Sequence, residues 1–223
     1  MKSLSFQKPD RSPTYTHSPV TTTCTPGERL IYKLIDWLSQ PTSYFCLRND
    51  NWQFLAMDTG LHAYKPIGGG PTFLENTEVE WLKDKVVNSG GRKNILLSHH
   101  QLFSAYDEID GGKHFNQKLY DQMSSIFPEV SMWFWGHEHN LVIFKRYMGM
   151  LGCCIGCGAF PVGIDEIPSK PKFPDVPVED VKLGKGAGLY NHGYAIVELS
   201  GPTATVSYYQ DTDENNPLFR EDI

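Results

Sequence analysis

Two short apolar runs that each end in histidine constrain the fold of this chain more than any other feature. The first run is Ile95 to His100, I-L-L-S-H-H, and the second is Trp133 to His139, W-F-W-G-H-E-H. Between the runs, apolar residues recur every four positions from Phe115 to Met123, as on one face of a helix. The pattern therefore predicts a β-α-β unit with strands over Asn94–Ser98 and Ser131–Trp135.

The histidines at the two strand ends are predicted to face one crevice, because ligand sites in open α/β sheets lie outside the carboxyl ends of the strands. Two histidines separated by one residue on extended chain project to the same side, and Gly136 permits a sharp departure from the strand. A lone histidine is usually a hydrogen-bonded core or surface residue. Four histidines at two strand ends instead favour a transition-metal site, since neutral imidazole binds Zn, Fe or Ni well.

The N-terminal part shows a change of character near residue 25. Residues 1–25 are rich in Ser, Thr and Pro without helical or strand periodicity, so they are predicted to be disordered. The folded domain is expected over residues 26–223. A T-x-x-E capping box at Thr25, with Pro26 at the first helical position, predicts a helix over Glu28–Ser39.

The next segment predicts a hairpin and a second helix. Two aromatic-rich runs, Ser43–Leu47 and Trp52–Met57, are separated by turn-favouring residues and indicate a β-hairpin. A second T-x-x-E box, Thr77 to Glu80, is expected to open a helix whose apolar face spans Val79 to Val86. Gly90 and the glycine after it should end this helix.

The C-terminal third is predicted to be rich in β-strands. Strand patterns begin at Leu141 and include Tyr194–Leu199 and Thr203–Tyr209, after a polar loop over residues 166–186. The uncharged stretch Met148 to Ile164 approaches the length of a membrane span, but its glycines and its proline favour a buried strand followed by turns. We therefore expect no association with a membrane.

Composition limits the classes of partner and the compartment. The chain has 20 basic and 26 acidic residues, a net charge of -6, which argues against binding nucleic acid or anionic membranes. Its five cysteines are odd in number and irregularly spaced, and the first residues contain no secretory signal, so a reducing, cytoplasmic location is expected. Cys154 and Cys157 have C-x-x-C spacing, but no second pair exists, so buried thiols are favoured over a metal or redox site.

Two further segments have both a functional and a structural interpretation. The glycines of Gly68–Gly70 are compatible with a phosphate cradle, but no Lys-Ser or Lys-Thr follows, which favours a loop bordering the cleft. Asp107, Glu108 and Asp110 form an acidic loop after the first histidine pair. A solvated rim is favoured over a catalytic role there, with a minor part in substrate discrimination as the alternative.

The G-H-E-H run, preceded by a strand that ends in His-His, resembles the last two motifs of the calcineurin-like metallophosphoesterases in order and spacing. Tyr44 to Asn49 and Leu55 to Gly60 are also similar to members of that family, so the resemblance covers residues 29–215. It implies an α/β fold, namely part of a four-layer αββα sandwich with a β-rich C-terminal part.

The resemblance also implies a function, that of a metal-dependent phosphoester hydrolase. In that family two divalent metals polarise a phosphoryl group and hold a bridging hydroxide that attacks phosphorus. His99 and His137 would bind one metal and His139 the other, with Mn, Fe or Zn as the ions. His100 would be a catalytic residue facing the phosphoester substrate. Glu138 is expected to point away, as a solvated or structural residue.

The sequence departs from the family in its first half. The motifs D-x-H, G-D-x-x-D and G-N-H-D or G-N-H-E are absent, since Asp58 is followed by Thr-Gly, Asn49 lacks the histidine, and Asn191 lies at the wrong end of the chain. Without the oxygen ligands that these motifs supply, a two-metal site is incomplete. We therefore expect a truncated hydrolase that is weak or inactive alone and needs a missing N-terminal half. The alternative is a non-catalytic metal-binding remnant or an interaction fragment.

Overall fold

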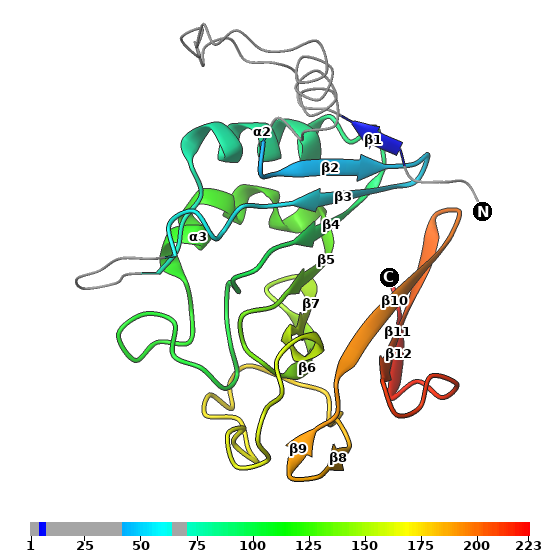
Figure 1. The fold of residues 1–223 in the computed structure, drawn as a ribbon. Helices are drawn as coiled ribbons and strands as arrows, with labels where there is room; N and C mark the ends of the chain where they lie inside the picture. Colours follow the sequence, from blue (N-terminus) through cyan, green and yellow to red (C-terminus); the bar gives the residue numbers. More distant parts are fainter. Residues whose placement is uncertain (1–4, 8–41, 64–70) are drawn as a thin grey trace, which may run out of the picture.

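The computed structural model describes residues 5–7, 42–63 and 71–223 (Figure 1). Its largest element is a seven-stranded mixed sheet in the order β1-β2-β3-β4-β5-β7-β6, in which the pairs β3-β4, β4-β5 and β5-β7 are parallel and the others are antiparallel. The strands are β1 Ser5–Gln7, β2 Phe45–Arg48, β3 Trp52–Ala56, β4 Lys93–Leu97, β5 Val130–Trp135, β6 Leu141–Tyr147 and β7 Met150–Ile155.

Few helices accompany this sheet in the described residues. Within them, the α-helices are α2 Asn76–Val87 and α3 Gln117–Met123, and the 3-10 helices are Ser124–Glu129 and Gly156–Gly158. The predicted β-α-β unit is confirmed as β4-α3-β5, and the predicted hairpin is confirmed as β2 and β3. The helix predicted before residue 40 and the glycines at 68–70 lie outside the described residues. So does the segment predicted to be disordered, except for the three residues of β1.

The predicted start of α2 is wrong. The helix begins at Asn76 with Glu75 as its N-cap, which makes no side-chain capping bond, so Thr77 and Glu80 form no capping box. Glu78, in the first turn, is turned inward and accepts a hydrogen bond from the backbone N–H of Asp58 at 2.8 Å. The apolar face was predicted correctly, because its members Val79, Leu82 and Val86 are buried.

Two apolar cores cover the two faces of the seven-stranded sheet. Successive residues of β5 alternate between them: Trp133 and Trp135 belong to the core on the helical side, while Met132 and Phe134 belong to the other. A three-stranded antiparallel sheet packs on that second face and consists of β10 Gly193–Ser200, β11 Thr203–Gln210 and β12 Phe219–Asp222. Figure 1 shows α2 and α3 on one side of the large sheet and this small sheet on the other.

The remaining β-structure is a two-stranded ribbon, β8 Lys185–Gly186 and β9 Leu189–Tyr190. The uncharged stretch from Met148 to Ile164 is strand β7 followed by turns, as predicted. Within the described ranges, no helix has the length and apolar character needed to cross a membrane. The described cysteines, including Cys154 and Cys157, are buried free thiols, which confirms the interpretation of the C-x-x-C spacing.

Candidate metal centre

Three loops meet at the carboxyl ends of the central strands of the large sheet because they follow three adjacent parallel strands. Asp58 to Gly60 follow β3, Ser98 to His100 follow β4, and Gly136 with His137 follow β5. The backbone joins the last two loops directly, since the Gly136 N–H donates to the carbonyl of His99 at 3.0 Å. The topology thus places histidine side chains at the carboxyl ends of the strands, where ligand sites of open α/β sheets lie.

His99, His100 and His137 form a compact cluster, in which one ring nitrogen of each lies within 4.8 Å of the others. Nδ1 of His137 is 3.3 Å from Nε2 of His99. Two nitrogens bound to one zinc ion at about 2.0–2.1 Å in tetrahedral geometry lie about 3.3–3.4 Å apart. The spacing of the His99–His137 pair and its imidazole donors therefore fit a borderline divalent metal such as zinc.

The environment of the cluster favours neutral imidazoles, the form that binds metals. Burial lowers the pKa of His100 to about 4, with smaller contributions from His137 and His99. Burial and the neighbouring His99 also lower the pKa of His137, while Asp107 opposes that shift. Both rings are thus uncharged near neutral pH, with lone pairs available for coordination.

His139 lies outside this cluster. It is exposed, and its ring stacks on Phe160 with centroids 5.1 Å apart. It is still close enough to His137 to lower the pKa of that residue. The assignment of His139 to a second metal remains a prediction.

His100 is held by a residue that the sequence did not single out, Thr59. The backbone N–H of His100 donates to Thr59 Oγ1 at 2.9 Å, and Nδ1 of its ring lies 3.3 Å from the same oxygen. Ser98 Oγ donates to the His100 carbonyl at 2.7 Å and accepts from Trp133 Nε1 at 2.8 Å. Thr59 is completely buried, so its hydroxyl is a fixed partner for the His100 ring.

The G-H-E-H loop is tightly constrained. His137 has a φ of 66°, in the left-handed region that residues with a Cβ seldom occupy. Gly156 lies beneath the loop, and a Cβ at this position would be 1.9 Å from the carbonyl oxygen of Glu138. A glycine is therefore required there for the loop to approach the end of β7.

Glu138 corrects part of the sequence interpretation. It is not solvated, because it is only 5% exposed and lies beneath the cluster. Its carboxylate accepts a hydrogen bond from Gln101 Nε2 at 3.1 Å and bonds to the side chain of Ser104. Burial raises its pKa to about 7. Of the two roles predicted for Glu138, solvated or structural, the structural role agrees with its buried position.

A cleft of about 180 Å³ opens beside the cluster. Its lining contains His100 and His137 together with Thr72, Asn116 and the acidic loop. Asp107 and Glu108 are exposed on the rim of this cleft, as predicted, and Glu108 forms an ion pair with Lys172. The rim is therefore acidic but partly neutralised.

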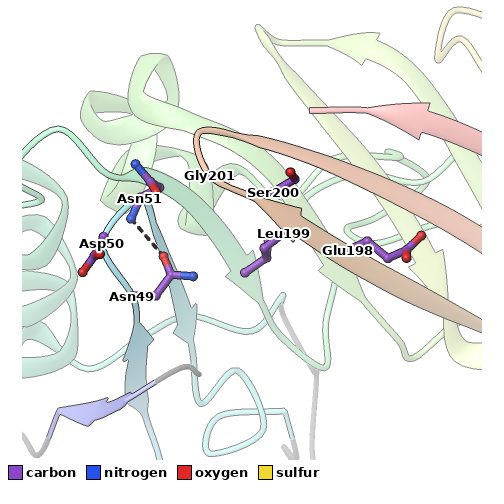
Figure 2. Close-up of a pocket in the computed structure, with 7 residues that line it drawn as sticks. All are labelled: Asn49, Asp50, Asn51, Glu198, Leu199, Ser200 and Gly201. Atoms are coloured by element: carbon purple, nitrogen blue, oxygen red, sulfur yellow. Dashed lines mark hydrogen bonds between the residues drawn. The ribbon is translucent and has the colours of Figure 1, made fainter. Parts of the chain in front are cut away.

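A larger cavity, of about 560 Å³, lies at the opposite end of β3 and contains no histidine (Figure 2). It is lined by the turn Asn49 to Asn51 between β2 and β3, and by the last residues of β10, Glu198 to Ser200, with Gly201 of the turn that follows. Figure 2 shows the Asn49 side chain bonded to the backbone of Asn51, so this polar group stabilises its own turn. Cavity size alone does not identify the candidate site.

The fold and the histidine cluster together define an α/β protein with three histidines that could hold a metal ion at the carboxyl ends of the central strands. The family model of the calcineurin-like phosphoesterases matches residues 16–141, more than half of the chain. The chain belongs to the calcineurin-like phosphoesterase family. No curated protein sequence matches it significantly.

Two solved structures agree with this chain at the level of the fold, and a third is reported with them. The purple acid phosphatase PPD1 from yellow lupin seeds has a TM-score of 0.52 at 10% identity, with 83% of this chain and 33% of that chain covered. PhoD has a TM-score of 0.50 at 11% identity, with 76% and 39% covered. GAP50, the anchor in the inner membrane complex of Plasmodium, has a TM-score of 0.49 at 14% identity, with 77% and 48% covered. The chain thus spans less than half the length of each of these proteins.

Proposed function

We propose that this chain carries the histidine side of a metal-dependent phosphoester hydrolase. The observation that supports the proposal is the cluster of His99, His100 and His137 at the ends of adjacent parallel strands, inside the segment matched by the family model. Membership of this family suggests phosphoester hydrolysis. In this proposal the helical layer and the two sheets are three of the four layers of an αββα sandwich.

The proposed site assigns a role to each of four histidines. His99 and His137 bind one divalent ion, Mn, Fe or Zn, and His139 binds a second. Such ions polarise a phosphoryl oxygen and generate hydroxide near neutral pH. His100, fixed by Thr59 and lining the cleft, faces the phosphoester substrate with a neutral ring.

The donor set of the cluster limits what the described residues do alone. Within 42–63 and 71–223, the cluster contains three imidazoles and no carboxylate. A two-metal phosphoryl-transfer site uses oxygen ligands to hold the ions and neutralise their charge. We propose that a polypeptide with the D-x-H and G-D-x-x-D motifs completes the site. The second candidate function, a non-catalytic metal-binding remnant, rests on the same donor set.

The test is hydrolysis of bis(4-nitrophenyl) phosphate with Mn or Zn. The chain alone should show no more than trace turnover, and fusion to a segment bearing the upstream motifs of the family should produce activity. In that fusion His99→Ala and His137→Ala should lose at least about a hundredfold in kcat/KM, since each removes a metal ligand.

His192→Ala is the matched control, because His192 lies outside the cluster and should retain activity. Equal activity of the chain with and without the upstream segment, measured after removal of contaminating phosphatase, would contradict the incomplete site. An inactive fusion that still binds zinc would favour the non-catalytic candidate.

A further inference from the structure

A buried polar pair lies directly beneath the histidine cluster. Gln101 follows His100 and Glu138 follows His137, and their side chains are only 4% and 5% exposed. Gln101 Nε2 donates to Glu138 Oε1 at 3.1 Å. One hydrogen bond thus connects the loop after β4 with the loop after β5, at the position adjacent to a cluster histidine in each.

Ser104 connects the same pair to the acidic loop. It is fully buried, and its hydroxyl oxygen accepts the backbone N–H groups of Tyr106 at 2.9 Å and Asp107 at 2.8 Å. Its side chain also bonds to the carboxylate of Glu138. The carboxylate therefore has two partners, both on the loop that follows β4.

The backbone of the G-H-E-H loop is fixed from the opposite side by β7. The thiol of Cys154 donates to the Glu138 carbonyl at 3.2 Å and lies 3.4 Å from the Gly136 carbonyl. The loop thus has a fixed backbone and an inward carboxylate. The two histidines that flank Glu138 are exposed.

Stability alone does not account for this choice of residues. Burying a carboxylate and an amide costs desolvation free energy, and a well-packed apolar pair of similar volume is often as stable or more stable. A directional hydrogen bond does what an apolar contact cannot, because it sets the separation and orientation of the two loops. Residues that orient metal ligands in this way typically change metal affinity by about 10–100-fold when they are mutated.

We propose that the Gln101–Glu138 hydrogen bond is a latch that sets the position of His137 relative to His99 and His100 and so determines metal affinity. Both are positioning residues, since neither belongs to the cluster itself. The inference rests on the proposed metal site. It adds two residues that act on that site through the loops that they join, and Gln101 also lines the cleft beside the cluster.

A charge swap across the pair tests the latch. Gln101→Glu places two carboxyl groups against each other in a buried site and should weaken Zn affinity by about 10–100-fold. The double variant Gln101→Glu/Glu138→Gln restores an amide-to-carboxylate bond in reverse and should return the affinity to within about threefold of the native chain. The measurement is Zn competition against a chromophoric chelator.

A spectroscopic readout separates positioning from general destabilisation. In the Co-substituted protein, the visible absorption bands should shift in Gln101→Glu and return to the native positions in the double variant. The thermal midpoint of each metal-free variant reports stability independently. Gln117→Glu, on the exposed surface of α3, removes only a surface hydrogen bond to Asp121 and is the control for the spectrum, which it should leave unchanged.

The outcomes distinguish the latch from the metal site on which it rests. If the native chain does not bind Zn or Co, the proposed metal site fails. If the native chain binds and Gln101→Glu binds equally well with an unchanged spectrum, only the latch is overturned. If Gln101→Glu does not fold, Gln101→Leu replaces it with the same expected loss of affinity, and a double variant that remains as weak as the single one also overturns the latch.

Discussion

Gly156 is the residue at which the histidine loop depends most strongly on a missing side chain. A Cβ there would be 1.9 Å from the Glu138 carbonyl oxygen, which is backbone and cannot rotate away. The same carbonyl accepts a hydrogen bond from Cys154 at 3.2 Å, so the loop has little room to retreat. The constraint therefore falls directly on the segment that carries His137 and His139.

Gly156→Ala is expected to displace this loop. The unfolding free energy should fall by about 1–3 kcal/mol, the usual cost of overpacking, and Zn affinity should fall at least about tenfold because the ligand geometry is lost. Gly158→Ala is the control, since a Cβ there meets Gly193 at an ordinary 3.5 Å. Chemical denaturation and chelator competition measure the two effects, and equal behaviour of both variants would contradict the proposed role of Gly156.

At the residue scale the sequence predicted the histidines better than their supports. His99 and His137 could be located because strand ends and a glycine define their places in the chain. Thr59 could not, because its contact with His100 spans 41 residues and leaves no local signal. The burial of Glu138 was missed because carboxylates are usually exposed, and the partner that satisfies it, Gln101, is 37 residues away.

At the scale of elements, strands were predicted more accurately than the start of α2. The strands follow from runs of apolar residues that are buried on both faces of a sheet, as in β5. The helix start depended on a capping pattern, but α2 begins at Asn76, one residue before Thr77, and its first turn contains the buried Glu78. This carboxylate accepts from the Asp58 N–H and so joins α2 to the loop after β3. Burial, with like charges nearby, raises its pKa from 4.5 to about 7.

This link predicts a stability that depends on pH. Folded Glu78 keeps its proton up to about pH 7, whereas the unfolded chain releases it near pH 4.5. The stability that Glu78 contributes to the folded state is therefore fully present below pH 4.5 and is lost as the pH rises to about 7. Glu78→Gln still accepts from the Asp58 N–H but cannot ionise. The variant should therefore have the same thermal midpoint as the native chain at pH 4.5. At pH 8 it should unfold at a higher temperature than the native chain.

Thermal midpoints between pH 4.5 and pH 8 measure this difference. Glu80→Gln, which alters an exposed carboxylate of the same helix, should follow the native curve throughout. Parallel curves for Glu78→Gln and the native chain would show that Glu78 ionises alike in the folded and unfolded states.

For the whole molecule, the fold class followed from the sequence but the strand order did not. The β-α-β unit and the strand-rich C-terminal part indicated a mixed α/β fold. Consecutive strands usually lie side by side in chain order, yet β6 passes to the edge of the sheet and β7 returns to pair with β5 in parallel. The local sequence around β7, with Gly149 in the turn before it and Gly152 within it, does not indicate this crossover. The order places Cys154 and Gly156 beneath the histidine loop, so the support of the site depends on it.

Metal binding at this sheet edge should therefore stabilise the folded chain as a whole, with selectivity set by the donor atoms. The cluster histidines lie on the loops after two central strands, β4 and β5, so an ion that binds both loops would oppose separation of the sheet on unfolding. Imidazole donors favour Zn, Co or Ni, whereas Mg and Ca prefer oxygen ligands.

Zn at about a hundredfold excess over its Kd should add about 2.7 kcal/mol to the unfolding free energy. Mg and Ca at the same concentration should add nothing measurable, and His99→Ala should abolish the effect of Zn while His192→Ala keeps it. Thermal unfolding with each ion, together with the bound metal counted after dialysis, tests this, and we expect one Zn per chain. Stabilisation by Mg equal to that by Zn, or two tightly held ions that survive His137→Ala, would place the metal site elsewhere in the protein.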